Sequence, residues 1–349
     1  MVDKKLLIMG AVAAVLAGAA YVTTSNKKVS SPSLSGKSIL PSFNVADLSA
    51  IEIGGDKPLS LSLGDRGWKV DTLFGYPADI SKIRENILKL KDLKVGQVAN
   101  GMNIEKPVLV DLQDKNGKSL ASLSLGSKHM RKATGQAAMF GGGSFPDGRY
   151  VLFKDKAVLV NDALSAFDGD PKNWVDTSIA SVPASEVEKV SYFVGSSNAI
   201  LTRDGTSWKL EGLSDKEELD SSKLYGVDSV LSHLDFTDIA DSSKAETYGF
   251  TTGVVYAATL KNGISYMANI GNASGDGKYM RISSSFKPMG TNAVENAKLE
   301  KIVKDFNAKV GNWVFVVSSY SASSMSKNRS DFVKAKESPK KESPTEQKK

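Results

Sequence analysis

The sequence predicts an α+β protein made of two tandem homologous modules behind an N-terminal transmembrane helix. Each module is expected to hold a mostly antiparallel sheet and one main amphipathic helix. Three observations predict this fold: an internal repeat, short stretches of alternating apolar and polar residues, and an uncharged segment near the N-terminus. At 349 residues the chain is long enough for two domains of ordinary size.

The repeat is the strongest of these observations. Residues 78–100 align without a gap on residues 219–241. The identical pairs are Asp79/Asp220, Ser81/Ser222, Lys82/Lys223, Leu90/Leu231, Leu93/Leu234 and Ala99/Ala240. GWKV matches SWKL upstream, and KNG and NWV each recur downstream. We therefore divide the chain into an anchor (1–22), a linker (23–44), a first module (45–180), a second module (181–324) and a tail (325–349).

Residues 6–22 carry no charge and lie between two lysine pairs. This length is at the lower edge of what spans a bilayer core, so we predict an uncleaved single-pass anchor. A cleaved signal peptide is the alternative, because Ala17-Gly18-Ala19 would suit a signal peptidase. Both interpretations place the body outside the cytoplasm, on the periplasmic side of the cell (inner) membrane.

Gly10, Ala14 and Gly18 share one face of this segment. Small residues at this spacing let transmembrane helices pack closely, so the face is a candidate docking surface for another membrane helix. The general abundance of Ala and Gly in the segment is the simpler explanation, and it is favoured.

The first module begins with alternating stretches at 48–54, 58–65 and 67–71, which predict antiparallel strands after a linker rich in Ser, Lys and Pro. Asp79 is expected to cap an amphipathic helix over 79–94. Hairpins are predicted at 108–126, with Asn116-Gly117 as a two-residue turn, and at 148–162.

The second module is expected to repeat this order. Its strands are predicted at 187–195 and 199–212, its helix at 220–235 behind the cap Asp220, and its hairpin at 254–270. The tail has almost no apolar residues after Val333 and is predicted to be disordered.

The net charge of +6 belongs to the ends of the chain. Residues 1–30 carry +3 and residues 325–349 carry +4, which leaves −1 for the body. Such a body has no electrostatic footprint for nucleic acid. The absence of cysteine excludes disulfides, thiolate catalysis and Cys-zinc sites.

No catalytic, cofactor or metal site emerges from the sequence. His129 and His233 occupy non-equivalent places in the two modules, which argues against a shared metal site or base. The glycine-rich run at 141–144 lacks the Lys-Ser/Thr of a phosphate loop and is interpreted as a connection. Lys128, Arg131 and Lys132 predict a basic loop, which is expected to be solvated rather than an anion site.

Four tryptophans occupy matching positions, Trp68 with Trp208 and Trp174 with Trp313. Matched positions favour core anchors, and a sugar-binding platform is the alternative. Tyr76 differs, because Gly75, Pro77 and Asp79 make its segment a turn into a helix. There we expect an exposed aromatic that makes a surface contact.

The run W-K-V…GYPAD, the helix ending KLKDLKV, the KNG hairpin, GRYVLF and NWVD…VPASEVEKV resemble the domain of unknown function 4340 (DUF4340) family. The resemblance covers about residues 45–320, although EGLSDKEELD replaces the GYPAD loop in the second copy. It implies a membrane-anchored extracytoplasmic protein, often encoded beside ABC-2-type permeases similar to those of gliding-motility systems. The family has no established catalytic residues, so none is transferred.

These observations predict a non-enzymatic accessory or scaffold protein associated with such a transport system, without cofactor. Its expected partners are the membrane and ABC-type permease subunits. A carbohydrate- or cell-wall-binding envelope protein is the alternative, and an envelope hydrolase is less favoured.

Overall fold

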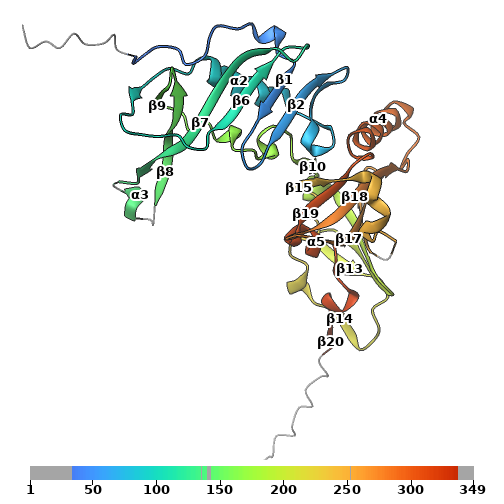
Figure 1. The fold of residues 1–349 in the computed structure, drawn as a ribbon. Coiled ribbons are helices and arrows are strands. Elements are labelled where there is room, and N and C mark those ends of the chain that lie inside the picture. The colour runs from blue at the N-terminus through green and yellow to red at the C-terminus, as the bar shows by residue number, and fades with distance from the viewer. Residues whose placement is uncertain (1–33, 135, 140–142, 252, 337–349) are drawn as a thin grey trace, which may run out of the picture. The chain divides into compact units, whose positions relative to one another are not determined.

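The computed structural model describes residues 34–336, except residues 135, 140–142 and 252. These residues form two compact units (Figure 1). Unit 1 comprises residues 34–48, 53–55 and 85–168, and unit 2 comprises residues 49–52, 56–84 and 169–336. The predicted anchor, with Gly10, Ala14 and Gly18, lies outside the described residues. Within the described ranges, no helix is both long and apolar enough to span a membrane.

Two nine-stranded sheets carry the fold. The first has the order β4-β3-β2-β1-β6-β7-β8-β9-β5. Its strands are β1 (Ala50–Ile53), β2 (Leu59–Gly64), β3 (Gly67–Val70), β4 (Tyr76–Pro77), β5 (Gln97–Val98), β6 (Val108–Gln113), β7 (Ser119–Lys132), β8 (Ser144–Phe153) and β9 (Lys156–Val160).

The second sheet has the order β10-β15-β19-β18-β17-β16-β11-β12-β13. Its strands are β10 (Ser178–Ala180), β11 (Val187–Val194), β12 (Ser197–Asp204), β13 (Ser207–Leu210), β15 (Leu234–Ala240), β16 (Val254–Leu260), β17 (Ile264–Ser274), β18 (Gly277–Phe286) and β19 (Val314–Ser318). A separate pair joins β14 (Glu217–Leu219) to β20 (Val333–Ala335). The helices are α2 (Ile80–Lys91), α3 (Gln136–Met139), α4 (Ala293–Val310) and α5 (Ser319–Ser324). The α+β class with mostly antiparallel strands is therefore confirmed.

Strands form where the sequence alternates between apolar and polar residues, as predicted. In β2, Leu59 and Leu61 are buried, while the alternating Ser60 and Ser62 are partly exposed. The hairpins also form: β6 pairs with β7, and β8 pairs with β9. The two-residue turn predicted at Asn116-Gly117 is wrong, because the Asp114 N–H donates to the Lys118 carbonyl and leaves a three-residue loop at 115–117. Period-2 burial thus sets the register of each strand, because one face of the sheet covers the core.

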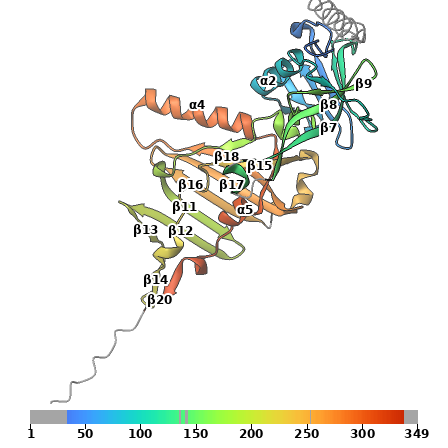
Figure 2. The same ribbon diagram turned by 90° about the vertical axis from the view of Figure 1, so that its left-hand side faces the viewer.

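The predicted helix at 220–235 is wrong. Asp220 does act as a cap, but only for a 3-10 turn at Ser221–Lys223, and turns follow until β15. Gly226, at φ 78°, and the serines and aspartate that follow it favour turns over helix. The main helix of unit 2 is α4 instead, which runs beside β18 (Figure 2).

Order also extends beyond the predicted body. Ile39, Leu40 and Phe43 are buried, although they lie in the predicted linker. Residues 325–336 of the predicted tail are ordered, and Met325 and Phe332 among them are fully buried. Disorder from residue 325 is therefore wrong for residues 325–336, because these two apolar side chains attach the segment to unit 2.

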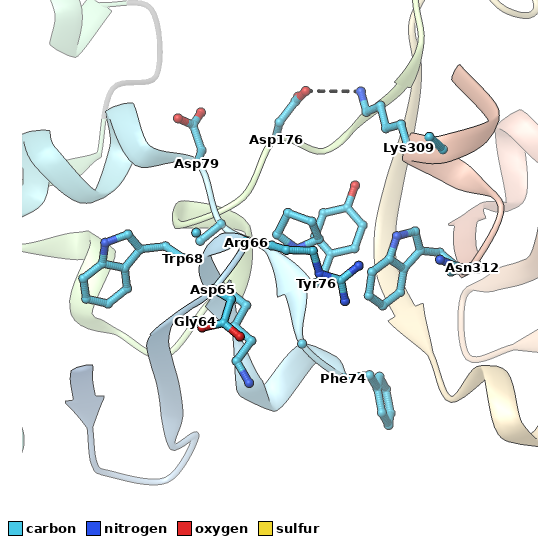
Figure 3. A pocket seen from close by; sticks show the side chains of 17 residues that line it. Gly64, Asp65, Arg66, Trp68, Phe74, Tyr76, Asp79, Asp176, Lys309 and Asn312 are labelled. Carbon is cyan, nitrogen blue, oxygen red and sulfur yellow. Dashed lines mark hydrogen bonds and ion pairs between the residues drawn. The ribbon is translucent and has the colours of Figure 1, made fainter. Parts of the chain in front are cut away.

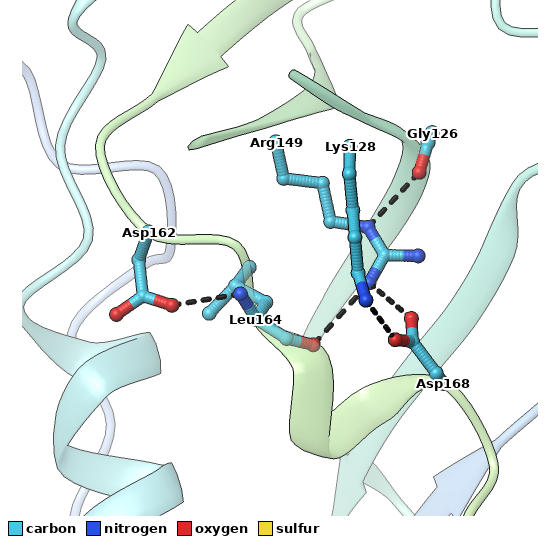
Figure 4. A network of polar contacts seen from close by, with 6 residues as sticks. All are labelled: Gly126, Lys128, Arg149, Asp162, Leu164 and Asp168. Atoms are coloured by element: carbon cyan, nitrogen blue, oxygen red, sulfur yellow. Dashed lines mark hydrogen bonds and ion pairs between the residues drawn. The ribbon is translucent and has the colours of Figure 1, made fainter. Parts of the chain in front are cut away.

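The predicted basic loop of unit 1 is also wrong, because Lys128, Arg131 and Lys132 lie on β7. Lys128 Nζ lies 2.5 Å from Asp168, which also accepts from the buried Arg149 at 2.7 Å (Figure 4). Arg149 donates further to the carbonyls of Gly126 and Leu164. A buried cation needs such partners, and here they come from the protein itself.

Candidate functional site

Unit 2 contains a cleft of about 970 Å³ (Figure 3). Residues 64–69 of the β2–β3 hairpin and residues 74–79 form much of its lining. Asp176 and residues at the end of α4 complete it. All the lining residues belong to unit 2.

The β2–β3 hairpin supplies one wall of the cleft. Asp65 and Arg66 form its two-residue turn, between the paired residues Gly64 and Gly67. Trp68 follows on the core-facing side of β3, but close to the turn, where the protein covers it less. Its ring is therefore half-buried and lines the cleft.

The next segment holds an aromatic residue in a strained backbone conformation. A 3-10 turn ends at Phe74, whose φ of 56° lies in the left-handed region. This conformation costs a residue with a side chain roughly 1–2 kcal/mol. Gly75 follows with φ 78°, and its N–H donates to the Val70 carbonyl at 3.0 Å. The Phe74 side chain lines the cleft with 54% of its surface exposed.

Tyr76 packs inward at the base of this wall. It is only 4% exposed, and its ring meets those of Phe236 and Trp313 edge-on, with centroids 5.1 and 5.0 Å away. Burial, and secondarily the charge of Asp176, raises the pKa of Tyr76 to about 12. The exposed position expected for Tyr76 is therefore wrong, and Phe74 is the exposed aromatic of this turn.

Asp79 connects the cleft to α2. Its backbone N–H donates to the Trp174 carbonyl at 2.8 Å, and its Oδ1 accepts from the Ser81 N–H at 2.8 Å. This confirms the predicted helix cap. Lys82 donates to the Val175 carbonyl at 2.7 Å, which holds the start of α2 in place.

The end of α4 and the residues after it form the opposite wall, and contacts with β18 hold this helix in place. The Asn307 side chain donates to the Ser284 carbonyl and accepts from the Ser284 N–H, both at 2.8 Å. The helix then ends at Gly311, so Asn312 and Trp313 lie at the cleft. Trp313 is half-buried, like Trp68.

The charged groups of the cleft balance. Three cations and three carboxylates line it, namely Arg66, Lys69, Lys309, Asp65, Asp79 and Asp176. Lys69 pairs with Asp71 at 3.0 Å, and Lys309 lies 3.4 Å from Asp176.

Figure 3 shows the Asp176–Lys309 pair at one end of the cleft and Phe74 at the other. Among the residues that the structure describes, the side chains of Asp65, Arg66 and Asn312 have no hydrogen-bond or ion-pair partner. These three polar groups are therefore available to a ligand.

The four tryptophans divide into two kinds. Trp174 and Trp208 are buried, as expected of core anchors. Trp208 is covered by Arg203, which lies opposite it on β12 with the guanidinium 4.6 Å from the ring. The residue opposite Trp68 is Leu63, which is half-exposed and takes the place that Arg203 has opposite Trp208. The prediction that Trp68 is a buried core residue is therefore wrong.

The histidines lie in different units. His129 Nδ1 is 2.6 Å from an oxygen of Asp147 on the β7–β8 hairpin, and His233 is exposed in unit 2. In the described part of the chain, no cluster of three or more His, Cys, Asp or Glu could hold a metal ion. The cleft was missed from the sequence because its walls are far apart along the chain. The one local signal was the GYPAD turn.

Comparison with known protein families matches residues 68–252 to the family described as Domain of unknown function (DUF4340). This match covers more than half of the chain and includes the segment that carries Trp68, Phe74 and Tyr76. Neither the curated proteins nor the solved structures that were compared gave a match. The chain therefore belongs to the DUF4340 family.

Proposed function

We propose that this chain is a non-enzymatic binding and scaffold protein of the cell envelope, and that the cleft is its recognition site. One observation carries the proposal: half-buried aromatic rings and unpartnered polar side chains line the same cleft. Small-molecule sites are typically clefts of roughly 300–1,000 Å³ that combine apolar walls with a few placed polar groups. The cleft of unit 2 has this size, and its lining combines aromatic rings with charged side chains and an amide.

The ionisable groups of the cleft support binding rather than catalysis. Asp79 caps a helix, and Lys69 and Lys309 are paired with carboxylates. An efficient general acid or base has a pKa near the working pH. Burial moves the pKa of Tyr76 away from that range, to about 12.

The proposal includes a tether and a partner. Residues 6–22 would hold the protein in the cell membrane with its body on the extracytoplasmic side, where it would serve as an accessory subunit of an ABC-2-type transport system. Support comes from the apolar segment and from the family resemblance. A phosphatase reporter fused after Lys349 is expected to be active. An inactive phosphatase, together with activity of a cytoplasmic reporter at the same place, would contradict this topology.

The partner is tested by purifying the tagged full-length protein in detergent. The permease and its ATPase should be recovered above the level of an untagged control. If neither protein is recovered, the transport role is wrong, whereas the proposed binding role is unaffected.

We also propose that the two sheets are tandem copies of one module. Support comes from strand order: β3-β2-β1-β6-β7-β8-β9-β5 has the same pattern as β13-β12-β11-β16-β17-β18-β19-β15. The repeated leucines behave alike, since Leu90, Leu231, Leu93 and Leu234 are all buried. An experimental structure in which these eight strands fail to superpose would refute the duplication.

A carbohydrate- or cell-wall-binding protein without a transporter is the second candidate. The exposed ring of Phe74 favours it, together with the half-buried Trp68 that lines the same cleft. Sedimentation with isolated cell wall, combined with no recovery of a permease, would select this candidate.

A further inference from the structure

The charge balance of the cleft limits the kind of ligand that it accepts. Its lining carries equal numbers of cations and carboxylates. A strongly anionic or cationic ligand would meet like charges as well as opposite ones, and like-charge contacts are unfavourable. The lining therefore suits a ligand without net charge.

The unpartnered groups indicate a ligand that is rich in hydroxyls. A carboxylate only accepts hydrogen bonds, a guanidinium only donates them, and an amide does both. Asp65, Arg66 and Asn312 supply one group of each kind. Hydroxyls can satisfy all three, because each hydroxyl both donates and accepts.

The aromatic rings indicate that the same ligand has apolar faces. Trp68, Phe74 and Trp313 all line the cleft, Phe74 with its ring exposed and the two tryptophans half-buried. Phe74 keeps this position in spite of its left-handed backbone, where glycine would be free of strain. Strain of this kind clusters at binding sites, where the surrounding structure maintains it.

A peptide added as an extra strand fits the cleft less well. The strand edge that lines the cleft is β4, at the end of the first sheet. β4 contains only Tyr76 and Pro77, and Pro77 has no N–H to donate. Main-chain pairing, which gives such peptides their affinity, is therefore restricted here.

We propose that the cleft binds a neutral oligosaccharide, with sugar rings lying on Phe74 and the tryptophans and hydroxyls bonded to Asp65, Arg66 and Asn312. This inference rests on the binding role proposed above. The cleft volume of about 970 Å³ suits an oligosaccharide better than a single sugar.

The test is calorimetric titration of the full-length protein in detergent. The neutral probes are tetrasaccharides of glucose and of N-acetylglucosamine, and the charged probe is a tetrasaccharide of galacturonate. Saturable binding is expected for at least one neutral probe, with the galacturonate probe at least tenfold weaker. Phe74→Ala and Arg66→Ala should each weaken binding at least tenfold, because each removes a side chain that is proposed to contact the sugar. Both side chains are exposed in the cleft, so the fold should be retained.

Phe193→Ala is the matched control, because Phe193 is an exposed phenylalanine of β11 outside the cleft. Its affinity should equal that of the wild type. Failure of both neutral probes, tighter binding of galacturonate, or unchanged affinity in Phe74→Ala would each overturn the proposal. Binding of a peptide pool that depends on Phe74 would assign the cleft to peptides.

Co-purification separates this inference from the proposed function. If the permease is recovered while no sugar binds, only the ligand class is wrong. If sugar binds without any permease, only the transport role is wrong.

Discussion

The rings of Tyr76 and Trp313 meet edge-on, with centroids 5.0 Å apart. Tyr76 belongs to the GYPAD turn and Trp313 follows the last turn of α4, so the contact joins segments that are distant along the chain. Edge-to-face aromatic pairs add roughly 0.5–1.5 kcal/mol to the free energy of burial. The Tyr76 side chain thus fixes the two walls of the cleft to each other.

Tyr76→Ala is expected to lower the free energy of unfolding by about 3–5 kcal/mol, the range for a large buried aromatic side chain. Tyr76→Phe keeps both ring contacts and should cost much less. Denaturant titration of the purified protein measures both variants. Equal losses would show that the hydroxyl, rather than the ring, supports the cleft.

The pH dependence of Tyr76 has a defined sign. Its pKa is raised from 10.0 to about 12 because burial favours the neutral phenol. The unfolded chain loses the phenol proton near pH 10, whereas the folded protein keeps it until about pH 12. Tyr76 therefore contributes its full stabilisation below pH 10, and this contribution is lost as the pH rises toward 12. Between pH 10 and 12, the free energy of unfolding should fall more steeply in the wild type than in Tyr76→Phe. Parallel curves from denaturant titrations across this range would contradict the assignment.

Trp208 and Trp68 provide a reciprocal test of the proposed duplication. Arg203→Leu removes the guanidinium over Trp208, so tryptophan emission should shift to longer wavelength. Leu63→Arg places a guanidinium opposite Trp68, where a stack of this kind contributes roughly 0.5–1 kcal/mol. The tryptophan emission of Leu63→Arg should therefore shift to shorter wavelength. An unchanged spectrum in Leu63→Arg would show that the two hairpins differ in geometry.

Local patterns predicted the local structure well. Alternation in LSLSL determines which leucines of β2 face the core, and Asp79 caps α2 through its carboxylate as expected. The hairpin at 108–126 also forms, but its loop has three residues, 115–117, rather than the predicted two: the Gly117 N–H donates to the Asp114 carbonyl at 3.0 Å, and Gly117 adopts a left-handed φ of 76°. Each of these features depends on a few neighbouring residues, which is why the sequence reveals them.

Features that depend on distant contacts were not predicted. The burial of Tyr76 depends on Phe236 and Trp313, and the order of residues 325–336 depends on the burial of Met325 and Phe332. A helix was predicted within residues 219–241 because they align with residues 78–100, which contain a helix. Gly226 favours turns in this segment instead. The internal sequence similarity therefore predicted the strand pattern better than it predicted the helices.

Arg149 tests the core of unit 1. Arg149→Met removes the buried guanidinium and leaves the carbonyls of Gly126 and Leu164 without their donor. Leaving a buried acceptor without its donor typically costs about 1–3 kcal/mol. Asp168 is partly exposed and keeps Lys128 as a partner, so its charge adds little to this loss. Lys128→Met should cost less, because Asp168 keeps Arg149 as a partner. Thermal unfolding compares the two variants, and a greater loss in Lys128→Met would contradict this ranking.

The last prediction concerns the predicted membrane segment, which lies outside the described residues. A helix that only tethers needs apolar length, whereas a helix that docks on a permease needs a smooth face for close packing. In the predicted helix, Gly10, Ala14 and Gly18 would form such a face. Gly10→Ile combined with Gly18→Ile should therefore leave membrane insertion intact and abolish co-purification with the transporter. Ala13→Ile with Ala20→Ile, which keeps the small face, is the matched control and should retain the partners. Equal recovery from both double variants would show that the association runs through the body of the protein.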